Sequence, residues 1–237
     1  MKLSTIAKTS LALGILTTGV MTTYAQSANA EVQTSVQNNN QSQDVNDLLT
    51  YYNKPSFDHR NVRGYKTGDK VDFVDEKYNQ HSEVGLVGNN KDKYKSDDDL
   101  SNIDVFVVRE GNGKQSSDYT IGGITQPNKL TYKDYVKRVP FSVESTSNGW
   151  KVEQGLGAHE ISKEEISLKE LDFKLRKKLI DKKLLYTDGK KNGKIVVKMN
   201  SGKENDKYTF ELDKKLQDHR MGDVIDSRNI EKITVEL

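Results

Sequence analysis

One long amphipathic helix, expected over residues 167–183, constrains the fold of this chain more than any other feature of its sequence. Its leucines recur at spacings of three and four residues and form one apolar stripe. They are Leu168, Leu171, Leu175 and Leu179. Ser167 and Glu170 have the spacing of a capping box at the start of the helix. Because a helix with a single apolar stripe must bury it, we expect a sheet to pack against the leucines.

Strand-like segments flank this helix on both sides. Each is a short apolar or alternating run, and they lie at 141–143, 150–152, 194–199, 207–212 and 230–235. A short helical turn is expected over 221–226. One long helix among four or five strands predicts an α+β domain over residues 136–237.

The preceding region, residues 44–135, has the pattern of a small all-β domain. Asp44 can cap a short helix that ends before Pro55. Beyond Pro55, apolar runs alternate with Gly, Asn and Asp clusters, and they lie at 71–73, 84–87, 103–108 and 119–121. Strands at this spacing predict a small antiparallel barrel or sandwich.

The first thirty residues have the pattern of a secretory signal peptide. Lys2 and Lys8 precede a short apolar run, and small residues up to Ala30 suit cleavage after that alanine. The apolar run is too short to span a bilayer. We therefore expect residues 1–30 to be removed and the protein to be secreted, without membrane insertion. Residues 31–43 are rich in Gln, Asn and Ser, which predicts a flexible leader.

Charge and cysteine content narrow the classes of function. The first thirty residues hold two lysines and no acidic residue, so 35 basic and 35 acidic side chains remain after cleavage. This balance argues against binding nucleic acid through bulk charge. The chain has no cysteine, which excludes disulfides and thiolate metal sites.

No pattern of a catalytic site stands out. The four histidines form no HxxxH or HExxH pair, and no serine lies in a GxSxG elbow. His219 and Asp223 are four residues apart and could share a metal, but a polar turn is the simpler interpretation. We therefore predict a protein that is not an enzyme and has no cofactor and no metal site.

The long helix also carries a longer pattern. Eight positions match the second signature of the staphylococcal and streptococcal superantigen toxins, which this chain resembles: Lys163, Ile166, Leu171, Asp172, Arg176, Leu179, Leu185 and Tyr186. Upstream, residues 122–125 (Gly-Gly-Ile-Thr) resemble the first signature. That match is partial, because Ile121 stands where a tyrosine is usual and Asn128 arrives early. The paired glycines would equally suit a tight bend between strands.

Within that family, the chain most resembles the staphylococcal superantigen-like proteins. The resemblance rests on the N-terminal leader and on residues 102–109, 166–176 and 220–229, and it covers nearly all of the chain from Asp44. It implies an N-terminal OB-fold barrel over 44–135 and a C-terminal β-grasp domain over 136–237. It also implies a secreted, non-enzymatic immune-evasion protein. The alternative is a mitogenic superantigen that bridges major histocompatibility class II molecules and T-cell receptors.

One subgroup of that set, whose members bind glycans of the sialyl Lewis X type, resembles the chain further at residues 208–216 and 220–223. The resemblance implies five glycan-binding positions, which are Thr209, Glu211, Lys214, Arg220 and Asp223. Asp213 departs from an asparagine common in that stretch. The implied partners are sialylated glycoproteins of host leukocytes or serum. A second protein partner could bind the barrel, and pairing of sheet edges could give a homodimer.

The residues by themselves are compatible with such a site. In a strand, Thr209 and Glu211 share one face while Phe210 points to the other. Arg220 offers a planar fork that suits the carboxylate of sialic acid. The competing interpretation is that these residues form an ordinary exposed strand face and that Arg220 pairs with Asp223.

Overall fold

The computed structural model describes residues 44–237 except 78, 95–99, 112–116, 148, 188, 190, 202, 204 and 205. The expected signal peptide (1–30) and leader (31–43) lie outside the described residues, so their boundaries stay predictions. In the described part of the chain, no helix is long and apolar enough to cross a bilayer. Nor do three or more His, Asp or Glu side chains of these residues gather where they could hold a metal ion.

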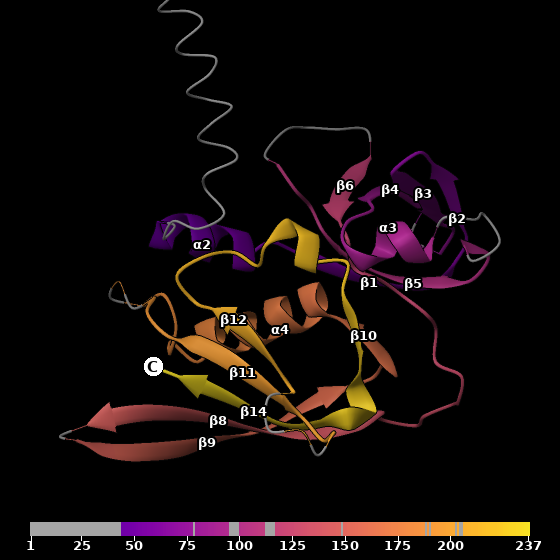
Figure 1. Ribbon diagram of the computed structural model, residues 1–237. Helices are drawn as coiled ribbons and strands as arrows, with labels where there is room; N and C mark the ends of the chain where they lie inside the picture. Colours follow the sequence, from indigo (N-terminus) through magenta and orange to yellow (C-terminus); the bar gives the residue numbers. More distant parts are fainter. Residues whose placement is uncertain are drawn as a thin grey trace, which may run out of the picture. The chain divides into compact units, whose positions relative to one another are not determined.

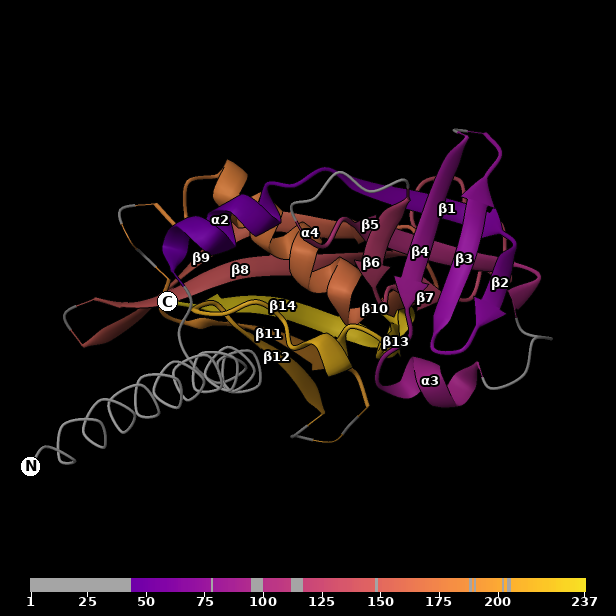
Figure 2. The same ribbon diagram turned by 90° about the horizontal axis from the view of Figure 1, so that it is seen from above.

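The N-terminal part begins with helix α2 (Val45–Tyr52), and the Asp44 side chain accepts a hydrogen bond from the backbone N–H of Asn46 as expected of its cap. Two sheets follow (Figure 2). One has the strand order β1-β5-β7 and the other β2-β3-β4-β6. The strands are β1 (Ser56–Val62), β2 (Gly64–Thr67), β3 (Lys70–Asp75), β4 (Gln80–Gly85), β5 (Ile103–Val108), β6 (Asp118–Ile121) and β7 (Ile124–Thr125).

The two sheets enclose one hydrophobic core. Its buried members are Val62, Val71, Phe73, Val84, Leu86, Tyr94, Leu100, Ile103, Val105, Val107 and Ile124. The sheets are not wholly antiparallel as expected, because β4 and β6 run parallel, with Val84 opposite Thr120. Parallel neighbours need a long connection, and here helix α3 (Asn89–Lys93) and strand β5 lie within it.

The C-terminal part is a five-stranded sheet of order β12-β11-β14-β8-β9 (Figure 1). Its strands are β8 (Lys137–Ser147), β9 (Trp150–Ile161), β11 (Lys194–Met199), β12 (Lys207–Glu211) and β14 (Ile230–Glu236). All strands expected in this half are present. The turn expected over 221–226 was placed wrongly. Short 3-10 turns η2 (Asp218–Arg220) and η3 (Ser227–Asn229) flank strand β13 (Val224–Asp226), which pairs with β10 (Glu165–Ser167).

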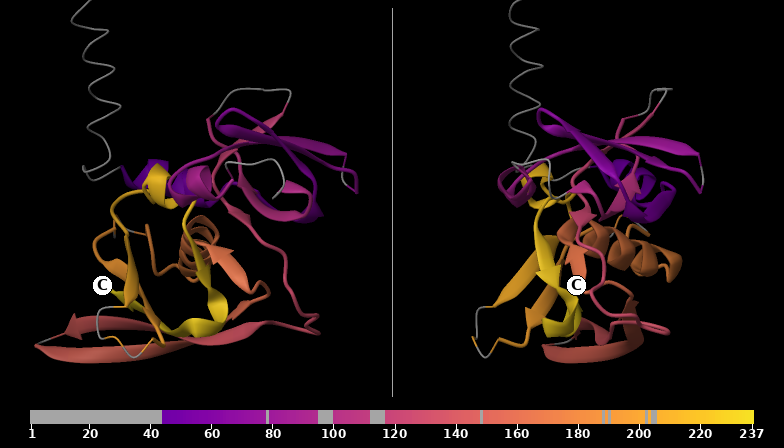
Figure 3. Two further views of the ribbon diagram at one scale, coloured as in Figure 1. Left: turned by 45° about the vertical axis from the view of Figure 1, so that its right-hand side comes forward. Right: turned by 90° about the vertical axis from the view of Figure 1, so that its right-hand side faces the viewer.

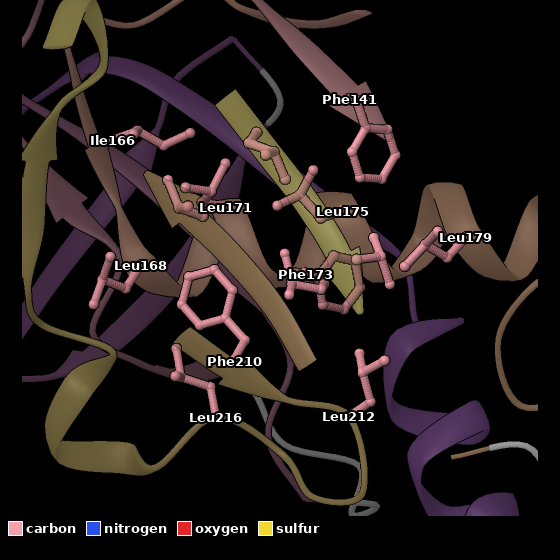
Figure 4. Close-up of a cluster of buried hydrophobic side chains, with 14 of the residues drawn as sticks. Phe141, Ile166, Leu168, Leu171, Phe173, Leu175, Leu179, Phe210, Leu212 and Leu216 are labelled. Carbon is pink, nitrogen blue, oxygen red and sulfur yellow. The ribbon is translucent and has the colours of Figure 1, made fainter. Parts of the chain in front are cut away.

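Helix α4 (Leu168–Asp181) lies on one face of this sheet (Figures 1 and 3). The predicted stripe is buried, because Leu168, Leu171, Leu175 and Leu179 are each at most 1% exposed. Figure 4 shows these leucines among Phe141, Phe210, Leu212 and Leu216 of the surrounding strands and loops. The Ser167 hydroxyl accepts from the Glu170 backbone N–H, as the capping pattern predicted. The Glu170 carboxylate instead accepts from Lys163 and Lys174.

The paired glycines 122 and 123 lie where the N-terminal sheets meet the C-terminal segment. Both have positive φ, +58° and +87°. A Cβ on Gly122 would lie 2.4 Å from the backbone oxygen of Met221, and the Gly123 N–H donates to that same oxygen at 3.0 Å. Glycine is required here for close approach between two segments that are remote in sequence, as well as for the bend.

Candidate functional site

The polar residues of the second signature form a buried network inside the C-terminal part. The guanidinium of Arg176 is fully buried and donates from Nε to Asp172 at 2.7 Å and from Nη1 to the hydroxyl of Tyr186 at 2.6 Å. Tyr52 of α2 donates to the other oxygen of Asp172 at 2.7 Å. Burial by itself lowers the pKa of Arg176, but the charge of Asp172 outweighs it and holds that pKa above the ordinary value.

This network also fixes the end of strand β12. Nη2 of Arg176 donates to the backbone oxygen of Glu211 at 2.7 Å, and the oxygen of Leu212 accepts from the Tyr186 hydroxyl at 2.8 Å. These carbonyls belong to the last residue of β12 and to the residue directly after it, and β12 carries the predicted glycan residues Thr209 and Glu211. The signature residues Asp172, Arg176 and Tyr186 therefore have a structural role, which is to position β12 from inside the molecule.

Strand β12 is an edge of the five-stranded sheet, with β11 as its neighbour on one side. Directly opposite residues of an antiparallel pair alternate between hydrogen-bonded and non-bonded positions. The Leu212 N–H donates to the backbone oxygen of Gly193, and the Met199 N–H donates to that of Asp206. In this register, the even-numbered residues of β12 are therefore the ones whose backbone is hydrogen-bonded to β11. The backbone N–H and C=O of Thr209 consequently point away from β11, out of the sheet edge.

Arg220 lies against this edge. Its Nη1 donates to the outward-pointing carbonyl of Thr209 at 3.0 Å and to the side-chain oxygen of Gln217 at 3.2 Å. Its guanidinium carbon lies 5.7 Å from the ring centroid of Phe210. Among the described residues, none accepts a hydrogen bond from Nε or Nη2 of Arg220. The half-exposed side chain is thus held by one nitrogen, and the Nε–Nη2 fork is left for another acceptor.

Glu211, the last residue of β12, and Lys214 form a second pair. Their side chains are in ion-pair contact, with Glu211 52% exposed and Lys214 16% exposed. Both line a cavity of about 580 Å³ on the outer face of the sheet, at the end where residues 192–193 connect to β11. Thr209, Arg220 and Asp223 do not line it.

Asp223 is oriented differently from the expected pairing with Arg220. Its carboxylate accepts from the side-chain amide of Asn89 in α3 at 2.8 Å. Burial, followed by the negative charges of Asp206 and Asp223, raises the pKa of the Tyr208 hydroxyl in β12.

The structure therefore brings the predicted residues together in two pairs, Thr209 with Arg220 and Glu211 with Lys214. Asp223 stands apart, against Asn89. Two residues that hold these groups were not foreseen. Gln217 supports Arg220 only because a 3-10 turn brings them together, and Asn89 comes from the N-terminal part. No local sequence signal marks either of them.

Comparison with known families identifies both parts of the chain. Residues 46–128 match the staphylococcal superantigen-like OB-fold domain, and residues 139–237 match the β-grasp domain of staphylococcal/streptococcal toxins. The predicted fold class, an OB-fold followed by a β-grasp domain with one long helix, is confirmed. The exact boundary expected between residues 135 and 136 stays a prediction.

Relatives in Staphylococcus aureus match the whole length of the chain. Superantigen-like protein 11 of strain Newman is 48% identical over 237 residues, with 100% of both chains covered. A solved structure of the superantigen-like protein SSL5, complexed with sialyl Lewis X, is 37% identical with a TM-score of 0.69 and covers 82% of this chain and 100% of that chain. A Staphylococcus aureus superantigen-like protein in complex with 3-N-acetylneuraminyl-N-acetyllactosamine is 39% identical, with a TM-score of 0.69, and covers 82% and 98%.

Proposed function

This chain belongs to the staphylococcal superantigen-like proteins, and from that premise we propose that it is a secreted immune-evasion protein that binds sialylated glycans on host leukocyte or serum glycoproteins. Two structures similar to it hold sialyl Lewis X and a sialylated lactosamine. We place the site on β12 and the turn after it, at Thr209, Glu211, Lys214, Arg220 and Asp223. Secretion would follow removal of residues 1–30.

The proposal rests on how Arg220 is held, with Nη1 bonded to the protein and Nε and Nη2 left for another acceptor. A guanidinium that is tethered at Nη1 loses little further conformational freedom when it binds. Its remaining fork has the geometry for two parallel hydrogen bonds to a carboxylate. The outward N–H of Thr209 supplies a third donor at the same edge. Three donors at one sheet edge, two of them on a cation, suit the carboxylate of a terminal sialic acid.

The experiment compares Arg220→Ala, Arg220→Lys and wild type for binding to sialyl-N-acetyllactosamine, by calorimetry and on a glycan array. Loss of the fork should weaken binding by about 2–5 kcal/mol if the bound pair is desolvated. Lysine should rescue little, because it cannot donate in the bidentate geometry. Sialidase treatment of neutrophil lysate should abolish capture of glycoproteins by the wild-type protein.

A folded Arg220→Ala protein with undiminished glycan binding would refute the site. Lys177→Ala is the matched control, because it removes an exposed basic side chain from α4, where we place no glycan contact. T-cell proliferation with purified protein tests the alternative, a mitogenic superantigen. Our proposal expects no proliferation.

A further inference from the structure

Strand β9 is the second edge of the five-stranded sheet, at the opposite end from β12. The hairpin of β8 and β9 extends past the other strands (Figures 1 and 3). Near its C-terminal end the β9 edge is protected, because Lys178 of α4 donates to the carbonyl of Ala158 at 2.7 Å. Residues 150–155 are all exposed, and among the described strands only β8 pairs with them. A free edge of this kind is a template for a further strand.

The hydrogen bonds of β8 show which backbone groups face outward on this open stretch. The Leu237 N–H donates to the carbonyl of Glu144 at 3.0 Å, so Glu144 bonds on the side of β14 and not to Glu153, its opposite residue on β9. Bonded and non-bonded pairs alternate along an antiparallel ladder. The N–H and C=O groups of Lys151, Glu153 and Gly155 therefore point away from β8, where a second strand can bond to them.

The same stretch exposes apolar side chains on the core face of the sheet. Val143, which is buried, stands directly opposite Gln154. Gln154 shares one face of β9 with Trp150 and Val152, because the side chains of a strand alternate. Trp150 is 77% exposed and Val152 is 49% exposed. The core face of the sheet thus continues into solvent along the hairpin and ends in a tryptophan.

Two charged residues of the stretch, Lys151 and Glu153, lie on the other face. Within the described part of the chain, neither forms an ion pair. Glu153 stands opposite Glu144, which itself stands opposite Glu236, so three carboxylates follow one another across the sheet. Like charges in directly opposite positions are destabilising. A partner strand that places a basic residue beside Glu153 would offset this repulsion.

We propose that the occupant of this edge is a second copy of the chain, whose β9 pairs antiparallel with residues 150–155 about a two-fold axis. Because only the odd-numbered residues offer backbone bonds, the registers that pair most of the stretch centre the axis on Val152 or on Glu153. Centred on Glu153, the axis sets this carboxylate opposite its own copy, which is unfavourable. Centred on Val152, it sets Lys151 opposite Glu153 of the partner subunit twice. The charges therefore select the register centred on Val152.

This register also joins the exposed apolar groups. Val152 faces its own copy in a non-bonded pair, where side chains are closest, and the two Trp150 side chains flank this pair on the same face. The two five-stranded sheets become one, with the two β12 strands at its opposite ends. The dimer would then carry two sialic acid sites, a consequence that rests on the proposed function. Two sites that bind one cell surface raise the apparent affinity through effective concentration.

Sedimentation at low ionic strength measures self-association of wild type and charge variants. Wild type should form a weak dimer that depends on concentration, because the interface is small. Glu153→Lys and Lys151→Glu each replace two attractive contacts by two repulsive ones, and each should weaken the dimer at least about tenfold. The double variant Lys151→Glu/Glu153→Lys exchanges the charges and should dimerise like wild type. An equimolar mixture of the two single variants should form heterodimers, because one edge is then acidic and the other basic.

The matched control is Glu160→Lys, which makes the same change of charge at an exposed position of β9 beyond the open stretch. It should dimerise like wild type. Wild type that stays monomeric at every concentration overturns the inference, and so does a double variant or a mixture that fails to recover association. Equal losses in Glu160→Lys and Glu153→Lys overturn it as well, because net charge would then be the cause.

A second measurement tests the two-site arrangement. From a surface dense in sialyl-N-acetyllactosamine, wild type should dissociate at least about tenfold more slowly than Glu153→Lys, while both bind the free glycan equally in calorimetry. Equal dissociation rates overturn the two-site arrangement. Failure of wild type to bind any sialylated probe refutes the proposed function instead, and the sedimentation result then still decides whether β9 pairs with its copy.

Discussion

Replacing Arg176 with methionine tests whether the second signature is a structural device that positions β12. Methionine keeps an unbranched but shorter side chain and removes the charge and the hydrogen-bond donors of arginine. Asp172, 2% exposed, would then be a buried carboxylate without its cationic partner. Breaking a buried pair from one side costs about 3–5 kcal/mol. The Glu211 carbonyl also loses its donor, which adds about 1–3 kcal/mol if no water replaces it.

We therefore expect Arg176→Met to lower the free energy of unfolding by about 4–8 kcal/mol, a large part of the total for a domain. The double variant Arg176→Met/Asp172→Leu removes the uncompensated charge and should recover most of the loss. Recovery should be incomplete, because Tyr52 then loses its acceptor. Urea unfolding followed by far-ultraviolet circular dichroism measures this. The single tryptophan, Trp150, is 77% exposed and would be a poor reporter of folding.

The same variants connect stability to the proposed site. Since Arg176 holds the carbonyl of Glu211, the single variant should weaken sialoside binding even at temperatures where it is fully folded. A loss of less than about 1 kcal/mol in Arg176→Met, or a double variant no more stable than the single one, would contradict this account of the network.

Three further predictions concern other parts of the molecule. Burial, followed by the charges of nearby lysines, lowers the pKa of His159 from 6.5 to about 4. The unfolded state therefore binds more protons between these pH values, and the free energy of unfolding should fall by about 3 kcal/mol as the pH drops from 6.5 to 4. His159→Gln should lack this part of the pH dependence in denaturant titrations. Gly122→Ala should lower the free energy of unfolding by about 1–3 kcal/mol, because the new Cβ would clash with the backbone of Met221. Gly68→Ala, at a glycine of similar φ with open space around it, should lower it by only about 1 kcal/mol. Equal losses of melting temperature in the two variants would argue against the close approach at Gly122. Thr209→Pro should fold normally, because the N–H that it removes points away from β11, but it should lose sialoside binding. A protein that fails to fold would show instead that this N–H takes part in the hydrogen bonds between β12 and β11.

Local patterns in the sequence predicted α4 and the main strands of the C-terminal sheet, together with the faces that they bury. The leucine spacing located α4 and its buried stripe, and Ser167 marked its start, because helix period and capping depend on residues within one or two turns. Strand alternation likewise assigned Phe210 to the core and Glu211 to solvent. The residues of the proposed site that share a strand face could therefore be predicted.

Only the tertiary structure decided how those faces combine into a site. The carbonyl of Thr209 receives Arg220 because β12 is an edge strand in one particular register, and the cavity beside Glu211 exists because four strands align their charged rows. The parallel pairing of β4 with β6 and the contact of Asp223 with Asn89 are further examples. Register and strand order are set by packing between segments remote in sequence, so no local period of side chains can specify them.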